Sequence, residues 1–267
     1  MSSKGIYTAL SGAMAQNQRL ETIANNIANA NTTGFKKDEQ VFREYITANE
    51  KPPDVIQVPR VPASVESFYD MQGGDKAFAE SVGTYSNHSQ GALKNTGGTL
   101  DLAIEGEGFF EVLTPSGLRL TRNGSFKTDS QGRLVNSEGH LVLGQGVGAD
   151  PAQRTIRLTG RNVTISYSGE VYDAGQSVGQ LSVVTPTNKD ALQKQGSSLF
   201  ALKEGYNSPM VRANEAKIHQ GFVEMSNVNV VEEMTNLIQA TRTFEAAQSA
   251  MKAFDSMDQR LVNDVPR

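Results

Sequence analysis

Four carboxylates lie close together near the middle of the chain, at Asp101, Glu105, Glu107 and Glu111. Two carboxyl groups held a few ångströms apart can act as acid and as base or nucleophile in glycoside hydrolysis. On a strand, positions 105, 107 and 111 would share one face. Because glycines and phenylalanines interrupt the run, we interpret it as a solvated strand edge whose charge discourages strand addition. A peptidoglycan-acting enzyme that uses Glu105 and Glu107 remains an alternative hypothesis.

The three histidines, His88, His140 and His219, do not suggest a metal site. None has a second His at metal-ligand spacing, and the chain contains no Cys. The glycine-rich segment 144–149 resembles a dinucleotide-binding fingerprint, but Asp150 and Pro151 follow where a helix should begin. We therefore expect no catalytic residue, no cofactor, no metal and no small-molecule substrate.

Charge and hydropathy exclude further classes of partner. The 267 residues carry a net charge of −4, which provides no broad basic surface for nucleic acid. No stretch approaches the roughly 20 apolar residues of a membrane span. No apolar run of signal-peptide length follows the first residues. We expect no nucleic-acid partner, no membrane span and no cleaved signal peptide.

Both ends of the chain carry apolar residues in alternating steps of three and four, the spacing of a narrow seam on a helix. The first seam consists of Ile6, Leu10, Ala13, Asn17, Leu20, Ala24 and Ile27. The second consists of Val230, Met234, Leu237, Thr241, Phe244, Ala247, Met251, Phe254 and Met257. We predict helices over 3–30 and from Asn229 to about 261, packed against each other and against copies of the chain. Asn17 would be a buried polar residue that fixes their register.

The residues between the two helices follow other patterns. Four prolines between positions 52 and 62 exclude a long helix, so we expect an extended arm with a short strand near 55–58. From about 98 to 220 the pattern has period two and is divided by turns, which predicts antiparallel strands. These are expected at 109–113, 118–122, 125–128, 133–136, 140–143, 154–158, 162–166, 170–172 and 178–184. Asn123-Gly124 predicts a hairpin.

Together these patterns predict the fold class α+β. Long N- and C-terminal helices would form a coiled-coil-like pair, and the central part would be an antiparallel all-β domain. The predicted segments are an N-terminal core helix at 1–35, an extended Pro-rich arm at 36–97, the β-domain at 98–220 and a C-terminal core helix at 221–267.

Several stretches resemble the signatures of the bacterial flagellar rod and hook proteins. At the N-terminus these are Ser11-Gly-Ala-Met-Ala-Gln16, Ile23-Ala-Asn-Asn-Ile-Ala-Asn29 and Asn31-Thr-Thr-Gly-Phe-Lys36. The others are Leu100-Asp-Leu-Ala-Ile-Glu-Gly-Glu-Gly-Phe-Phe110, Thr121-Arg-Asn-Gly-Ser-Phe126 and Gln220-Gly-Phe-Val-Glu-Met-Ser-Asn-Val-Asn-Val-Val231. The resemblance marks as motif residues Asn25, Asn26, Asn29, Gly34, Phe35, Asp101, Gly106, Gly108, Phe109, Phe110, Ser226, Asn227 and Val228.

The resemblance implies a non-enzymatic structural subunit of the basal-body rod. Its terminal helices would form the core of a tubular axial structure that transmits torque, with the two seams as the assembly interface. The implied partners are copies of the chain, other rod proteins and the flagellar type III export apparatus. The length and single β-domain resemble rod proteins of the FlgF and FlgG kind, and the opening motif is closer to the proximal than to the distal member. A distal position, or an adhesin with a coiled-coil stalk, remains an alternative.

Overall fold

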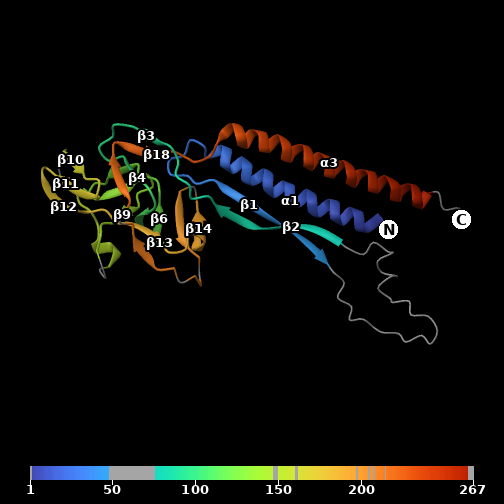
Figure 1. Cartoon of the computed structure of the whole chain (residues 1–267), viewed down its shortest axis with the longest axis horizontal. Coiled ribbons are helices and arrows are strands. Elements are labelled where there is room, and N and C mark those ends of the chain that lie inside the picture. Colours follow the sequence, from blue (N-terminus) through green and yellow to red (C-terminus); the bar gives the residue numbers. More distant parts are fainter. Residues whose placement is uncertain are drawn as a thin grey trace, which may run out of the picture. The chain divides into compact units, whose positions relative to one another are not determined.

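The computed structural model of the chain describes residues 2–47, 76–146, 150–159, 162–196, 198–203, 205–206, 208–213 and 215–263. The predicted α+β class is confirmed: two long terminal helices pack together, and antiparallel sheets form between them in the sequence (Figure 1). The chain divides into two compact units. The first contains residues 1–24, 40–84 and 234–267, and the second contains residues 25–39 and 85–233. The four-segment division drawn from the sequence stays a prediction.

The two helices, α1 (Ser2–Ala28) and α3 (Val230–Asn263), agree closely with the predicted ranges. The start of α3 is determined by Asn229, whose side-chain oxygen accepts hydrogen bonds from the amides of Val231 at 3.2 Å and Glu232 at 3.4 Å. Glu232 and Glu233 occupy the first turn, where carboxylates interact favourably with the helix dipole.

The buried stripe of α1 differs in phase from the predicted seam. Ala13 and Ile23 are buried, whereas Asn17 and Ala24 are exposed. Asn17 is therefore not buried between α1 and α3 of one chain, and its amide donates to Glu21 Oε1 at 3.2 Å; its burial against copies of the chain stays a prediction. At 3.6 residues per turn, a seam that continues from Ala13 by three or by four residues reaches position 16 or position 17. Both positions carry polar side chains, so the sequence does not distinguish the two continuations.

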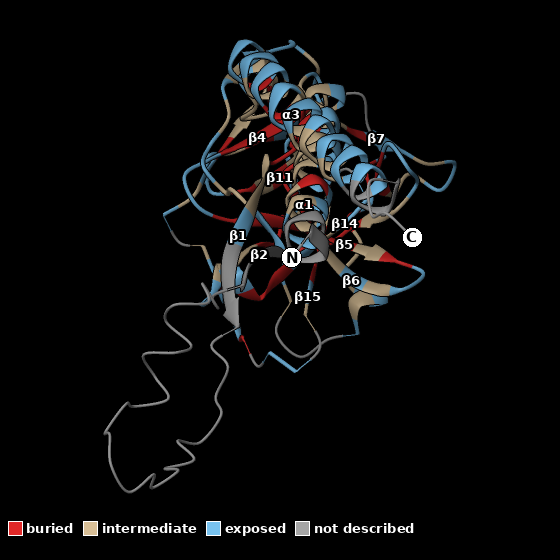
Figure 2. Ribbon diagram, turned by 90° about the vertical axis from the view of Figure 1, so that its right-hand side faces the viewer, coloured by how far each residue is buried: buried red, intermediate tan, exposed pale blue. Residues whose placement is uncertain are grey.

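The predicted seam of α3 corresponds more closely to the covered face of that helix. The half-buried members are Val230, Leu237, Thr241, Phe244, Ala247, Met251 and Phe254. Ala240 is buried within the same face, while Met234 is exposed. In α1, Leu20 and Ile27 are half-buried and Leu10 is exposed, and the side chain of Ile6 lies outside those described. Most of the surface of both helices is exposed or intermediate (Figure 2).

Two strands that the sequence analysis did not predict follow α1. Strands β1 (Asp38–Thr47) and β2 (Lys76–Ser86) pair as a two-stranded sheet. They lie on either side of the proline cluster, which obscured them because it dominated the composition of the whole arm. The strand expected near 55–58 lies outside the described residues.

The second unit contains the remaining strands. They are β3 (Leu93–Asn95), β4 (Leu102–Glu105), β5 (Phe109–Thr114), β6 (Gly117–Thr121), β7 (Phe126–Thr128), β8 (Leu134–Asn136), β9 (Leu141–Val142), β10 (Val163–Ile165), β11 (Glu170–Asp173), β12 (Gln176–Gln180), β13 (Val183–Pro186), β14 (Leu192–Gln195), β15 (Leu199–Leu202), β16 (Met210–Arg212), β17 (Lys217–Gln220) and β18 (Phe222–Glu224). Short 3-10 helices occupy Pro151–Gln153 and Lys189–Ala191.

The strands of the second unit form four antiparallel sheets. The largest has the order β14-β15-β6-β5-β9-β8-β7, with β13 pairing both β5 and β16. A three-stranded sheet has the order β10-β11-β12, and two pairs, β17-β4 and β18-β3, bring the residues before α3 back onto the start of the β-region. The main hydrophobic core lies among these sheets, and Phe110 and Phe126 meet edge to face within it at 5.2 Å between centroids.

The predicted hairpin at Asn123-Gly124 is wrong. Strand β6 pairs with β5 and β15, and β7 pairs with β8, so the dipeptide connects strands that are not neighbours. The side-chain oxygen of Asn123 accepts a hydrogen bond from the amide of Ser125 at 3.1 Å, which stabilises a local turn. Gly124 lies against β4, where an added Cβ would come within 1.6 Å of Leu102 O. Asn-Gly was therefore required here for turn geometry and close approach, not for a hairpin.

The acidic run does not form one solvated strand edge. Glu105 ends β4 and Glu107 lies between strands, both exposed, whereas Glu111 is a buried residue of β5. The Glu111 carboxylate accepts hydrogen bonds from Ser182 Oγ at 2.6 Å and from the Arg154 guanidinium at 2.9 Å. Ser182 and Arg154 lie far from Glu111 in the sequence, so the local pattern around Glu111 could not predict these contacts. The three carboxylates therefore share no face.

Two further strand predictions need correction. Residues 154–158 form only isolated bridges, from Thr155 to Leu143 and from Arg157 to Arg133, beside β9 and β8 of the largest sheet. The single strand expected at 178–184 is divided between β12 and β13, which belong to different sheets.

Candidate functional site: a buried polar junction

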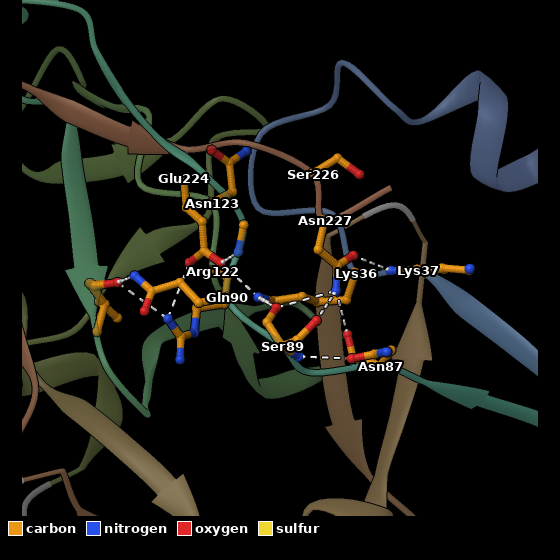
Figure 3. Close-up of polar contacts among 12 residues, drawn as sticks. Lys36, Lys37, Asn87, Ser89, Gln90, Arg122, Asn123, Glu224, Ser226 and Asn227 are labelled. Carbon is orange, nitrogen blue, oxygen red and sulfur yellow. Dashed lines mark hydrogen bonds and ion pairs between the residues drawn. The ribbon is translucent and has the colours of Figure 1, made fainter. Parts of the chain in front are cut away.

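A buried carboxylate, Glu224 at the end of β18, is the centre of a polar junction in the second unit (Figure 3). Its Oε1 lies 2.6 Å from Lys36 Nζ and accepts the amide hydrogen of Gly91 at 2.9 Å. Its Oε2 lies 3.1 Å from the guanidinium of Arg122. The side chains of all three charged residues are at most 4% exposed. The junction therefore joins the segment after α1, the end of β6 and the strand before α3.

The two cations of this junction are held by further acceptors. Lys36 Nζ donates to Ser89 O at 2.6 Å, and Arg122 donates to Gly106 O at 2.7 Å. Burial lowers the pKa of both Lys36 and Arg122, and the charge of Glu224 opposes that shift. One buried carboxylate serves two buried cations, so Glu224 is the group on which the electrostatic balance depends. Removing one member of such a buried cluster is strongly destabilising, because it leaves a buried charge without its partner.

A second set of bonds joins the last turn of α1 to the first turn of α3. Asn26 donates from Nδ2 to Asp38 O at 2.9 Å and to Glu233 Oε2 at 3.3 Å, and its Oδ1 accepts the Asp38 amide hydrogen at 3.0 Å. Lys37 Nζ lies 2.9 Å from Glu233 Oε1. Burial works against the charge of Lys37, but the hydrogen bond and charge of Glu233 outweigh it and raise the Lys37 pKa. Asn26 and Glu233 are almost fully buried.

Asn227 joins three segments just before α3. Its Oδ1 accepts the amide hydrogen of Lys37 at 2.7 Å. Its Nδ2 donates to Asn87 O at 2.9 Å and lies within 3.2 Å of both acceptor oxygens of Ser89 (Figure 3). An amide side chain suits this position because it offers an acceptor and two donors at once.

The turn after α1 needs a glycine and a covered aromatic ring. Gly34 has φ +70°, and an added Cβ would lie 2.3 Å from the backbone nitrogen of Asn123. Its own amide donates to Glu224 O at 2.8 Å. The adjoining Phe35 is buried, with the Lys194 ammonium 3.5 Å from the centre of its ring. Lys194 Nζ also donates to Asp38 Oδ2 at 2.8 Å, so β14 holds the same segment from another side.

The contacts of this junction join segments of the chain to one another. Among the described residues, no group of three or more metal-ligating side chains could hold an ion. Neither described helix has an apolar stretch long enough to cross a bilayer.

Three protein-family models match this chain in order along its length. One described as flagella basal body rod protein matches residues 6–36, one described as flagellar hook protein FlgE/F/G D1 domain matches 103–173, and one described as flagellar basal body rod FlgEFG protein C-terminal matches 219–264. The chain is 32% identical to the flagellar basal-body rod protein FlgG of Bacillus subtilis, over 97% of this chain and 98% of that protein. It is 35% identical to FlgF of Caulobacter vibrioides, over 92% of this chain and 91% of that protein.

The chain belongs to the FlgF/FlgG family of flagellar basal-body rod proteins. It is a structural subunit of the flagellar rod and not an enzyme, and this assignment replaces the alternatives of a peptidoglycan-acting enzyme and an adhesin.

The FlgF/FlgG motif residues near α1 fall in two groups. Asn26, Gly34 and Phe35 take part in the junction as described. Asn29 donates to the backbone oxygen of Asn25 at 3.0 Å, which supports the end of α1, and Asn25 itself is exposed. The first group holds distant segments together, and the second finishes a helix.

The FlgF/FlgG motif residues of the β-region support the same second unit. Asp101 accepts from Thr96 Oγ1 at 2.6 Å, and Phe109 and Phe110 are buried. Gly106 has φ +94° and Gly108 has φ +142°, so both adopt backbone conformations that favour glycine.

Before α3, Asn227 takes part in the junction, while Ser226 and Val228 are half-buried neighbours. The oxygen of Ser226 accepts the Val228 amide hydrogen at 3.3 Å.

The sequence analysis missed the charged members of the junction as site residues. Lys36, Arg122 and Glu224 all stand inside motifs that it quoted, but they were not singled out. One signal was available for Glu224, because it is a charged residue directly after two apolar ones, Phe222 and Val223, within a quoted motif. The corresponding partners lie 188 and 102 residues away, and pairing at that separation leaves no local pattern.

Proposed function

We propose that this chain is a proximal, FlgF-type rod subunit that polymerises through its terminal helices and transmits torque from the motor to the hook. One observation carries the proposal: the packed pair α1 and α3 leaves large apolar side chains uncovered. These are Tyr7, Leu10, Met14, Val231, Met234, Ile238 and Met257. The predicted seam residues Leu10 and Met234 are among them. Neighbouring rod subunits would cover these side chains.

The energetics favour assembly over an isolated helix pair. Fully burying one Leu, Met or Ile contributes roughly 1.5–3 kcal/mol relative to leaving it exposed. Long helices with little packing are marginal in water, so further burial against neighbours would also order the ends of the helices. Several such side chains per copy therefore give assembly a large driving force.

The junction suits a subunit that carries a twisting load. Asn26 and Glu233 connect the last turn of α1 with the first turn of α3 directly, and Lys37 binds the same carboxylate. Lys36, which adjoins Lys37, binds Glu224, and Glu224 binds Arg122 in the β-region. A load on the two helix ends would therefore reach the β-sheets through these noncovalent contacts as well as along the backbone. Copies of this chain, other rod proteins and the export apparatus are the proposed partners, and we propose export without a cleaved signal.

The distal, FlgG-type position is the alternative. The identity of 35% to Caulobacter FlgF supports the proximal position, as does 34% to FlgF of Mesorhizobium japonicum. The fuller coverage by Bacillus FlgG, 97% of this chain, supports the distal one.

Deletion of the gene, with an epitope-tagged copy for complementation, tests the proposal. We expect the deletion strain to be non-motile and to assemble no hook, and the tagged copy to restore swimming and to co-purify with basal bodies. Gold labelling of the tag should lie at the end of the rod nearest the cytoplasm. A label at the hook end would support the distal alternative, and a motile deletion strain would contradict a role in the rod.

A further inference from the structure

His88 lies half-buried beside the junction, in the segment that joins β2 to β3. Its ring meets the rings of Phe109 in β5 and Phe200 in β15 edge to face, with centroids 5.6 and 5.3 Å away. Its Nδ1 is buried and has no hydrogen-bond partner among the described residues. We assign the neutral ring its hydrogen on Nε2, because a hydrogen on Nδ1 would be buried without an acceptor. Protonation of the ring would create that unsatisfied donor.

The charged groups that face His88 are mostly positive. Lys36 acts from the segment after α1, Arg122 from the end of β6 and Lys189 from the short 3-10 helix before β14. Asp190, in the same short helix, opposes these cations with a smaller effect. Burial lowers the pKa of His88 to about 4, and the three cations act in the same direction. A protonated ring would therefore add positive charge where positive charge already dominates.

The carboxylates that could compensate such a charge are already paired. Glu224 binds both Lys36 and Arg122, and it could turn to an imidazolium only by leaving a buried cation without its partner. Glu107 lies 2.5 Å from Lys189 Nζ and is exposed, so it contributes little to a buried ring. Expulsion of the ring into water is then the least costly response to protonation.

The residues on either side of this histidine make contacts that close the junction. The amide of Asn87 donates to Lys37 O at 2.8 Å, and Asn87 O accepts from Asn227 Nδ2 at 2.9 Å. Ser89 O accepts from Lys36 Nζ at 2.6 Å and from Asn227 Nδ2 at 3.2 Å. Displacing the ring would move both neighbours and break these hydrogen bonds.

The next residues in each direction are held in place by other contacts. Ser86 Oγ donates to Asp38 Oδ1 at 2.7 Å. Gln90 donates from Nε2 to Ile104 O at 3.1 Å, and its Oε1 accepts the amide hydrogen of Gly106 at 3.2 Å. The residues between Ser86 and Gln90 can therefore open as a short segment with both ends held.

We propose that His88 is an acid-sensitive latch on the junction. Protonation drives its ring out from between the two phenylalanines and opens residues 87–89, while the rest of the second unit stays folded. Asn227 then loses its acceptors in this segment and Lys36 loses Ser89 O, whereas the contacts of Glu224 with both buried cations remain. Acid thereby loosens the connection before α3 without breaking the central ion pairs. The inference goes beyond the proposed function and does not rest on it.

Hydrogen exchange of single amides in the purified full chain tests the latch, after correction for the effect of pH on chemical exchange. The Asn87 amide, which binds Lys37 O, and the Lys37 amide, which binds Asn227 Oδ1, report the opening. A pKa of about 4 in the closed segment and 6.5 in the open one predicts that opening rises about twentyfold from pH 7 to 5 and about a hundredfold from pH 7 to 4. Protection of both amides should fall by these factors.

An amide in the largest sheet distinguishes opening of the latch from unfolding of the whole unit. The Leu143 amide donates to Glu111 O at 2.9 Å, far along the chain from the latch. At each pH, we expect it to be at least about tenfold better protected than the Asn87 amide. Low concentrations of urea should reduce protection at Leu143 but hardly at Asn87, because opening three residues exposes little surface. Equal protection and equal urea dependence at the two amides would overturn the latch.

His88→Phe removes the titrating group and keeps an aromatic ring beside Phe109 and Phe200. Protection of its Asn87 amide should change by less than about threefold between pH 7 and 5, where the wild-type chain changes about twentyfold. His140→Phe is the matched control, because it removes another partly exposed histidine of the same unit and should behave as the wild type does. Loss of protection in His88→Phe equal to that of the wild type would overturn the proposal.

A measurement on the wild-type chain decides the question if His88→Phe does not fold. Titration of the His88 ring by nuclear magnetic resonance should give a midpoint near pH 4, with the Asn87 amide losing protection as the pH falls from about 6.5. A ring that titrates near 6.5 or an Asn87 amide whose protection is constant from pH 7 to 4 would contradict the latch.

Discussion

Replacing Glu224 with Gln should destabilise the protein far more than removing either of its partners. In Glu224→Gln the carboxylate disappears, and the two buried cations Lys36 and Arg122 remain without a counter-charge. Leaving a buried charge unpaired costs about 3–5 kcal/mol. In Lys36→Met the carboxylate keeps Arg122 at 3.1 Å and the Gly91 amide at 2.9 Å, so only the hydrogen bonds of one cation are lost. That loss costs about 1–2 kcal/mol.

Urea denaturation followed by far-ultraviolet circular dichroism measures both changes, since the chain has no Trp for fluorescence. Glu107→Gln is the matched control, because it removes the same chemical group from an ion pair at the surface. The Glu107 carboxylate lies 2.5 Å from Lys189 Nζ, and the Glu107 side chain is 72% exposed. A surface pair of this kind contributes at most about 1 kcal/mol. The order of destabilisation should be Glu224→Gln, then Lys36→Met, then Glu107→Gln. If Lys36→Met destabilised as much as Glu224→Gln, the idea that one carboxylate balances two cations would be wrong.

Three further predictions concern single positions. Gly34→Ala should destabilise by at least about 2 kcal/mol in the same urea assay, because it combines φ +70° with a Cβ only 2.3 Å from the Asn123 backbone; an unchanged midpoint would contradict the close approach. Asn229→Ala should destabilise by about 1 kcal/mol and Asn229→Asp by less, since Asp retains the capping oxygen; equal losses would show that the cap is unimportant. Burial, and to a lesser degree the charge of Lys36, lowers the pKa of His88 to about 4. As the pH drops, the unfolded chain therefore binds a proton at this position before the folded chain does. The free energy of unfolding should fall as the pH drops from about 6.5 and level off below about 4. His88→Leu should reduce this acid loss by on the order of 2 kcal/mol between pH 7 and 4, and a variant with the full wild-type acid loss would exclude His88 as its cause.

The sequence predicted those parts of the fold that depend on local patterns. The bounds of α1 and α3 followed from apolar spacing and from the capping oxygen of Asn229, both of which act within a few residues. Strand β5 and its hairpin partner β6 followed from alternation and an adjacent turn. These features were correct because the forces that produce them are encoded in neighbouring residues.

Features that depend on distant partners were missed or wrong. Asn17 and Gln16 are equally plausible seam residues until the opposite helix selects a face. Glu111 looked like a surface carboxylate because its partners Arg154 and Ser182 lie far along the chain. The junction was missed for the same reason, although Asn26, Gly34 and Asn227 were named through the family resemblance.

A density map of isolated basal bodies with this chain placed in it tests the central claim most directly. We expect α1 and α3 to lie against helices of neighbouring subunits in the rod, so that Tyr7, Met14 and Ile238 lose the exposure they have in the single chain. A map in which both helices face solvent, or in which the chain lies outside the rod, would contradict it.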